Sequence, residues 1–121
     1  MTNSRDKGKR YERHIAGRFK DYGYEARRTA QYCGNTGDAA DVDGVPYIHV
    51  ECKHQEQFRI YDWMAQAVHD SKKSGKIPTV IFKKNNHEDL VTMRFDDWMK
   101  LYKEYEVAMH FGTCMNPPEE G

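Results

Sequence analysis

Residues 40–53, ADVDGVPYIHVECK, constrain the fold more than any other segment of the chain. Gly44-Val45-Pro46 is a turn signal, and the residues after it alternate in character as a strand does, with successive side chains on opposite faces. The apolar members of this strand share one face: Ile48, Val50 and Cys52. The polar members share the other: His49, Glu51 and Lys53. The segment therefore predicts two strands joined by a tight turn.

The same turn brings two acidic residues together. Folding the chain back at Gly44 sets Asp41 opposite or nearly opposite Glu51, on the same face by parity. Directly opposed residues lie about 5 Å apart at Cβ, where two carboxylates repel each other unless a cation or a proton lies between them. Mg²⁺ is commonly held by one or two carboxylates together with substrate phosphate oxygens. Lys53, on the same strand face, can then orient or deprotonate a water that attacks the phosphate, so the pattern predicts a metal-dependent nuclease centre.

Periodicity along the rest of the chain predicts the order α-β-β-β-α-β-β-α, which is an α/β fold with a mixed sheet flanked by helices. The expected helices run from about Asp6 to Tyr22, from about Arg59 to Ser74, and over a last segment capped by Asp96 or Asp97. Further strands are expected at Tyr24–Thr29, Pro78–Lys84 and Leu90–Phe95, and a flexible loop at 32–40. Residues 1–115 are assigned to a single domain, and residues 116–121 to a disordered tail.

The arrangement of Asp41 and Glu51-x-Lys53 resembles the PD-(D/E)xK nuclease superfamily. A longer pattern resembles the phage-type Holliday junction resolvases of that superfamily over roughly residues 7–105, and consists of Gly37–Val42, Ile48–Lys53, Gln66-Ala67 and Pro78–Ile81. Ala40 stands where the family usually has a proline, which is not a ligand. The resemblance implies a restriction-endonuclease-like αβββαβ core, Mg²⁺ or Mn²⁺ as the cofactor, and phosphodiester hydrolysis that leaves 5′-phosphate and 3′-hydroxyl ends.

The resemblance also implies roles for individual residues. In the family a glutamate of the first helix approaches the metal centre, and Glu12 occupies that place, although an ion pair within its own helix is the alternative. Asp41 and Glu51 are expected to hold the metal, with the backbone carbonyl of Cys52 as a further ligand. Glu12 is expected to complete a second metal position or to anchor water there. Lys53 is expected to orient the attacking water and to offset the charge of the transition state.

Two loop residues and one helical amide have open interpretations. Thr36 lies where related resolvases hold a mobile residue with a small hydroxyl group, but an ordinary loop residue is the alternative. Asp38 is either an outer acid of the site or a turn former. Gln66 is either a surface amide or a residue that supports the active site or contacts DNA.

The charged residues are distributed unevenly, although the net charge is zero. Residues 1–30 carry nine Lys or Arg against four acids, whereas residues 85–121 carry eight acids against three bases. Such asymmetry allows a basic face toward phosphates; a solvated basic helix with an acidic tail is the alternative. The side chains expected to contact DNA are Arg10, Arg13, Arg27, Arg28, His54 and Gln66.

Several classes of protein are excluded by what the sequence lacks. It has no Walker loop or GxGxxG, so no nucleotide cofactor is expected. It has no nucleophile elbow, so a Ser-His-Asp hydrolase is not expected. No apolar run reaches transmembrane length, so no membrane partner is expected. The odd number of cysteines, three, favours reduced thiols and a cytoplasmic location, in the bacterial host if the protein is phage-encoded. A zinc site built on Cys33, Cys52 and His54 fits no common spacing.

Three functions remain: an endonuclease that resolves branched DNA, a restriction- or repair-like endonuclease acting on duplex DNA, and a catalytically silent DNA-binding domain. A complete set of Asp41, Glu51 and Lys53 argues against a silent domain. The short chain leaves little room for base readout in the major groove, whereas backbone contacts suffice to recognise the shape of a junction. We therefore expect a Holliday junction resolvase.

A homodimer is expected because a four-way junction has near two-fold symmetry and one chain has one active-site set. The second helix supplies a surface for pairing, since its apolar residues cover an arc wider than packing on a sheet requires. The residues on the side away from Trp63 are Tyr61, Met64, Ala65 and Val68. Coverage of these residues by the last helix of the same chain is the alternative.

Overall fold

The computed structural model describes residues 4–29 and 39–112. Its elements follow the predicted order: α1 (Ser4–Asp21), β1 (Arg27–Arg28), β2 (Val42–Asp43), β3 (Ile48–His54), α2 (Ile60–Asp70), β4 (Ile77–Lys83), β5 (Leu90–Thr92) and α3 (Phe95–His110). The predictions made for Thr36, Asp38 and residues 116–121 fall outside the described residues, as do Cys33 and most of the loop at 32–40.

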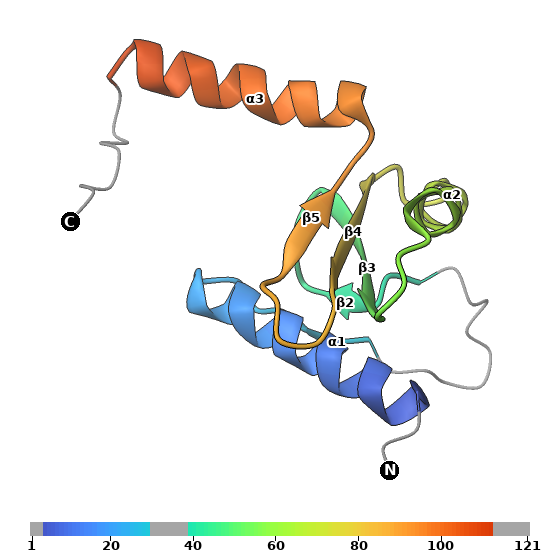
Figure 1. Cartoon of the computed structure of the whole chain (residues 1–121). Helices are drawn as coiled ribbons and strands as arrows, with labels where there is room; N and C mark the ends of the chain where they lie inside the picture. The colour runs from blue at the N-terminus through green and yellow to red at the C-terminus, as the bar shows by residue number, and fades with distance from the viewer. Residues whose placement is uncertain (1–3, 30–38, 113–121) are drawn as a thin grey trace.

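Within the described ranges, the strands form one five-stranded sheet in the order β1-β2-β3-β4-β5. The β1–β2, β2–β3 and β4–β5 pairs are antiparallel, whereas β3 and β4 are parallel because α2 connects them as a crossover. Helix α1 packs across β1, β2 and β3 on one face, and α2 packs on β3 and β4 on the other (Figure 1). The predicted mixed sheet with flanking helices is therefore confirmed.

Two apolar clusters fill the space between these layers. One lies under α1, where Ile15 and Tyr11 pack with Val50 and Ile81 of the sheet. The other lies under α2 and consists of Trp63, Ala67, Val80 and Phe82. Because β3 is central, its polar face is covered by α2 and is as buried as its apolar face: His49 and Glu51 are each 3% exposed. His49 is therefore part of the packed interior between β3 and α2.

Several boundaries differ from the sequence-based prediction. Helix α2 ends at Asp70 instead of Ser74, and the following turn is closed by the hydroxyls of Ser71 and Ser74, which donate to the Val68 and Ser71 carbonyls. Strands β1 and β5 are shorter than expected. The residue that caps α3 is Arg94, whose side chain makes no capping hydrogen bond to the helix.

The two aspartates predicted to cap α3 lie inside its first turn. Asp97 instead accepts hydrogen bonds from Arg94 Nε (2.9 Å) and Lys100 Nζ (3.3 Å). Burial opposes these contacts, but together they lower the pKa of Asp97. The aspartate therefore fixes the start of the helix through its cationic neighbours and not as a cap.

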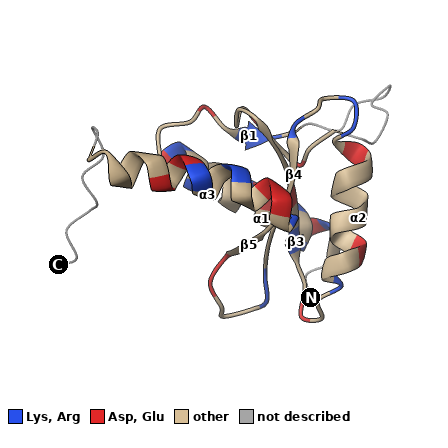
Figure 2. Cartoon of the chain, turned by 90° about the horizontal axis from the view of Figure 1, so that it is seen from above, with Lys and Arg blue, Asp and Glu red and all other residues tan. Residues whose placement is uncertain are grey.

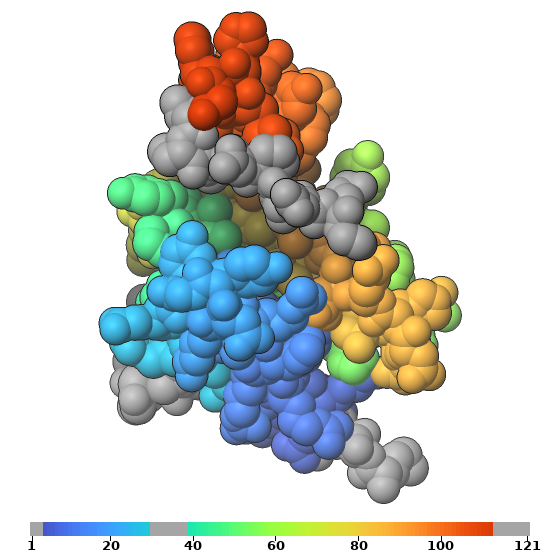
Figure 3. All heavy atoms as spheres, turned by 90° about the vertical axis from the view of Figure 1, so that its left-hand side faces the viewer, coloured from blue at the N-terminus to red at the C-terminus, as the bar shows by residue number. Residues whose placement is uncertain are grey.

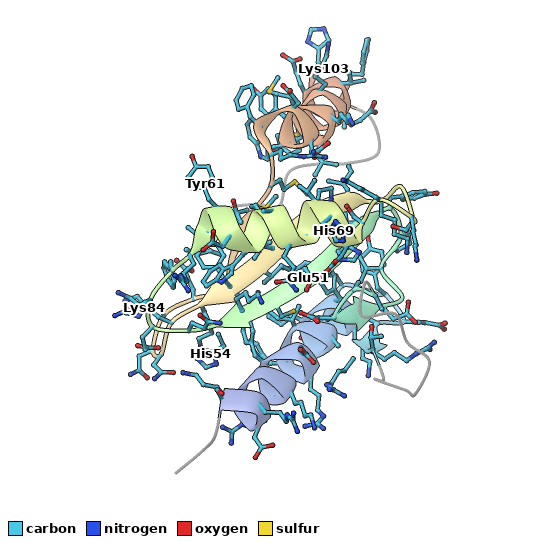
Figure 4. The ribbon with its side chains drawn as sticks, turned by 90° about the vertical axis from the view of Figure 1, so that its right-hand side faces the viewer. Glu51, His54, Tyr61, His69, Lys84 and Lys103 are labelled. Atoms are coloured by element: carbon cyan, nitrogen blue, oxygen red, sulfur yellow. The ribbon has the colours of Figure 1, made fainter. Side chains whose placement is uncertain are left out.

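Helix α3 extends away from the sheet (Figures 1 and 3). Of its sixteen described residues, only Asp97 is buried. It does not cover α2, where Tyr61 remains 92% exposed and points into solvent (Figure 4). The alternative in which the last helix of the same chain covers α2 is therefore not what the described residues form. Among those residues, no helix is long and apolar enough to span a membrane.

Candidate active site

The β2–β3 hairpin sets two carboxyl groups opposite each other. Val42 pairs with Val50 in antiparallel register, and Asp41, which directly precedes β2, lines the same pocket as Glu51. The Asp41 N–H donates to the Val50 carbonyl (2.8 Å), and the Cys52 N–H donates to Oδ2 of Asp41 (2.8 Å). The backbone around Cys52 thus holds the Asp41 side chain against the strand that carries Glu51.

The carboxyl groups at this site repel each other in a poorly solvated place. Burial, followed by the charge of Glu51, raises the pKa of Asp41 to about 8, against the opposing effect of the Cys52 N–H. Burial also raises the pKa of Glu12; Arg28 opposes this shift and Glu51 adds to it. A site of this kind favours either a bound proton or a bound cation, which is the condition expected of a metal centre.

Glu12 reaches this centre from α1. Its Oε1 accepts a hydrogen bond from Arg28 Nε on β1 (2.8 Å), in an ion pair that is largely shielded from solvent. The predicted alternative, a partner within the same helix, is not the contact that forms. Arg28 is therefore placed to hold Glu12 in addition to any role with DNA.

Lys53 and Gln66 also meet, because α2 covers the face of β3 that carries Lys53. The Lys53 Nζ donates to Oε1 of Gln66 (3.3 Å). Gln66 is thus hydrogen-bonded to Lys53, which favours a role in supporting the active site over that of a plain surface amide.

All of these side chains line one open pocket of about 460 Å³ between the N-terminal half of α1 and helix α2. Figure 4 shows Glu51 on the strand between these two helices. The lining residues are Ser4, Arg5, Gly8, Lys9, Glu12, Arg28, Asp41, residues 51–55, and Gln66. Helix α1 therefore contributes the cationic side chains of Arg5 and Lys9 to the same pocket as the acids, and neither was among the side chains expected to contact DNA.

Cys52 takes part through its backbone and not through its thiol. The side chain is buried, and burial, followed by the charges of Asp41 and Glu12, raises the pKa of the thiol well above its ordinary value. A neutral thiol is a poor metal ligand. This agrees with the expectation that any contribution of Cys52 to a metal comes from its carbonyl group.

His49 is the residue whose involvement the sequence did not reveal. Its Nε2 lies 2.8 Å from Glu51 Oε1, and both side chains are almost fully buried. A carboxylate of Asp70, from the end of α2, completes a group whose potential ligand atoms all lie within 4.8 Å of one another. The available signal was its spacing of two residues from Glu51, which puts both side chains on one strand face.

The predicted DNA contacts do not all gather at this pocket. Arg28 and Gln66 line it, and His54 lines both it and a second pocket beside α1, which also contains Arg10. Arg13 is exposed on α1 and lines neither pocket. Arg27 is exposed and pairs with Asp43 at 3.3 Å.

Comparison with known proteins identifies a matching family and a similar fold. Residues 3–115 match the model of a family described as "Phage putative PDDEXK endonuclease". The fold is similar to that of Hjc, a Holliday junction resolvase from the archaeal hyperthermophile Archaeoglobus fulgidus, with 21% identity and a TM-score of 0.55 over 71% of this chain and 76% of the other. No curated protein matches the sequence.

Proposed function

The chain belongs to the phage PDDEXK endonuclease family and is a nuclease of the PD-(D/E)xK superfamily, and we propose that it resolves four-way DNA junctions by metal-dependent hydrolysis. The observation that carries the proposal is the meeting of Asp41, Glu51 and Lys53 in one pocket with Glu12. The first three come from one hairpin, and the fourth from a helix that packs on it. A complete set of this kind argues against a catalytically silent domain.

The donor set fits a hard divalent cation such as Mg²⁺ or Mn²⁺. Carboxylate and carbonyl oxygens are the ligands that such ions prefer, and Asp41, Glu51, Glu12 and the Cys52 carbonyl supply them. The pKa of Asp41 is raised by burial and by the negative charge of Glu51, and a bound cation would offset both effects. When bound, a divalent cation supplies Lewis-acid polarisation of the scissile phosphate.

The protein's own residues orient the reaction. Water attacks phosphorus, the P–O3′ bond breaks, and the strand is left with a 5′-phosphate and a 3′-hydroxyl. Lys53, whose Nζ donates a hydrogen bond to Oε1 of Gln66 (3.3 Å), can orient the attacking water. It can also offset the negative charge that develops on the phosphate oxygens. His49 holds Glu51, and Arg28 holds Glu12, so both acids keep fixed orientations.

A branched substrate is favoured by the size of the molecule. The described chain consists of the sheet, the two helices that pack on it and α3, and it has little additional structure that could read base edges in a major groove. Backbone contacts from basic residues suffice to recognise the shape of a junction. Cleavage of ordinary duplex by a restriction- or repair-like enzyme is the second candidate, and the same active site would serve it.

A homodimer would supply the second active site that symmetric resolution needs. In support, α2 keeps Tyr61 and Ala65 exposed, and Figure 2 shows acidic residues near the ends of this helix with no basic residue along it. Closed two-fold pairing is the commonest symmetry of oligomers.

Light scattering should give about twice the 14.2 kDa of one chain. Met64 packs against the apolar cluster under α2, so the exposed Ala65 is the position to test. Ala65→Glu should yield monomers that nick junctions, whereas Gln57→Glu, in the exposed segment before α2, should leave the mass unchanged.

The function is tested by cleavage of a four-way junction, a fork and a linear duplex, each with Mg²⁺ and with EDTA. We expect the junction to be cut in Mg²⁺ only. Asp41→Asn and Glu51→Gln should each abolish cleavage while junction binding persists, whereas Asp43→Asn, on the same hairpin but outside the pocket, should cleave normally. Equal cleavage of linear duplex would favour the second candidate, and near-normal turnover by Asp41→Asn would refute the assigned centre.

A further inference from the structure

A second pocket of about 510 Å³ lies beside α1. From α1 it is lined by Lys7, Arg10 and His14, whose spacing of three and four residues puts them on one stripe of the helix. Tyr11, which is 3% exposed, lies between them and the sheet. The helix therefore presents a row of basic side chains along one wall of this pocket.

The opposite wall is formed where two parallel strands end. His54 is the last residue of β3 and Lys83 the last of β4, and the two are directly paired. The ring of His54 contacts that of Tyr11, with centroids 5.2 Å apart, and its Nε2 lies 2.9 Å from Oδ1 of Asn85. The fold thus joins residues from α1, β3 and β4 that are far apart in the sequence.

The pocket is electropositive. None of its lining residues is acidic. Lys7 has a distant partner in Glu56 at 3.8 Å, and His14 lies 3.0 Å from Asp89. Among the described residues, Arg10 and Lys83 form no ion pair.

The two pockets share one lining residue, His54. Its neighbour in the chain is Lys53, whose side chain faces the acids, and consecutive Cα atoms are about 3.8 Å apart. A polyanion that enters the active site is therefore led past His54 toward Arg10 and Lys83. A chain of linked phosphates fits this arrangement better than a separate small anion does.

We propose that this second pocket, defined by Lys7, Arg10, His14, His54, Lys83 and Asn85, binds a backbone phosphate of the same DNA whose scissile phosphate occupies the active site. The inference rests on the proposed nuclease function and adds a binding position to it. The pocket contributes affinity and register, and the chemistry stays with Asp41, Glu51 and Lys53.

Lys83→Ala and Arg10→Ala test the proposal. Each should raise KM for junction cleavage about tenfold, with the larger change in KM than in kcat. Each should also reduce the slope of log affinity against log salt by about 0.9, the value for one duplex phosphate contact. Lys20→Ala, an exposed cation in the last turn of α1 that lines neither pocket, is the matched control and should change neither quantity. Thermal unfolding of all three variants checks that they are folded.

The outcomes separate this proposal from the nuclease function. If the wild type cuts no DNA, the proposed function fails, and the salt slopes of binding still test the pocket. If the wild type cuts DNA but Lys83→Ala and Arg10→Ala keep its KM and slope, the pocket proposal is overturned while the function stands. A fall in kcat with unchanged KM would overturn it too, because it would make these residues part of the chemistry. Competition by inorganic phosphate as strong as that by DNA would identify a separate anion site and also overturn it.

Discussion

The folded protein is most stable when the carboxyl group of Asp41 carries a proton or faces a cation. Its pKa is raised to about 8 in the folded chain, from an ordinary value of 3.8. Since the folded state binds this proton more tightly than the unfolded state does, the associated stability is complete below about pH 4 and is lost as the pH rises through about 8.

We therefore expect the free energy of unfolding in EDTA to fall by a few kcal/mol between about pH 4 and about pH 8. The melting temperature should fall over the same range. Asp41→Asn should remove most of this fall, because the amide does not ionise. Added Mg²⁺ should restore the melting temperature of the wild type at the upper end of the range but not that of the variant. A wild-type profile that matches the profile of Asp41→Asn would contradict the assignment.

Lys53 is the residue whose position, more than its charge, should matter. Lys53→Ala should reduce kcat by about 100-fold or more, the usual effect of removing a positioned proton-transfer or electrostatic group. Metal affinity, measured by Mg²⁺ titration of cleavage, should change little. Lys72→Ala removes an exposed lysine just after α2 and is the control. An equal loss in both variants would mean that general charge, and not this position, supports the reaction.

At the scale of elements, the hairpin that carries Asp41 and Glu51 depends on one glycine. Gly44 has a φ of +90°, and a Cβ at this position would lie 2.2 Å from the backbone carbonyl oxygen of Glu25. The turn of the hairpin therefore packs directly against the segment that leads into β1. Only a residue without a side chain allows this approach.

Gly44→Ala should consequently destabilise the protein far more than Gly23→Ala. Gly23, two residues after the end of α1, has a φ of +97°, but a Cβ there would meet nothing within 4 Å. The second substitution should thus cost only the left-handed strain, about 1–2 kcal/mol, whereas the first adds a collision with the backbone. Urea unfolding of both variants measures the difference. Equal costs would show that the hairpin can move away from Glu25 without penalty.

At the scale of the whole molecule, α3 contributes almost nothing to the packed body that the structure describes. Its apolar and aromatic side chains are largely exposed: Phe95, Trp98, Leu101, Tyr102, Tyr105 and Val107. In contrast, Ile15 of α1 is 2% exposed within the core. The two helices therefore differ in what they stabilise.

A chain that ends after Met93 should keep the unfolding midpoint of the body at protein concentrations where the wild type is monomeric. The helical circular dichroism signal should fall by the contribution of α3, which has 16 residues. Ile15→Ala is the comparison, and should cost about 2–5 kcal/mol as buried large-to-small substitutions do. Loss of cooperative unfolding in the shortened chain would show that α3 supports the body.

The order of elements and the proximity of Asp41 to Glu51 could be predicted from the sequence. Both are local properties: strand alternation has a period of two, and a turn between two strands fixes which residues face each other. The shortness of β1 and the early end of α2 were not predicted, because pairing partners and the hydroxyls of Ser71 and Ser74 set those boundaries.

The contacts between residues from different elements could not be predicted, because they depend on the tertiary packing. The setting of α1 on the sheet brings Glu12 to Arg28 and builds the second pocket with the ends of β3 and β4. The docking of α2 buries His49 against Glu51 and brings Gln66 to Lys53. These contacts depend on how helices rotate and translate over a sheet, which is fixed by the packing of many buried side chains at once. Local spacing places His49 and Glu51 on one strand face, but it does not determine how the helices dock on the sheet.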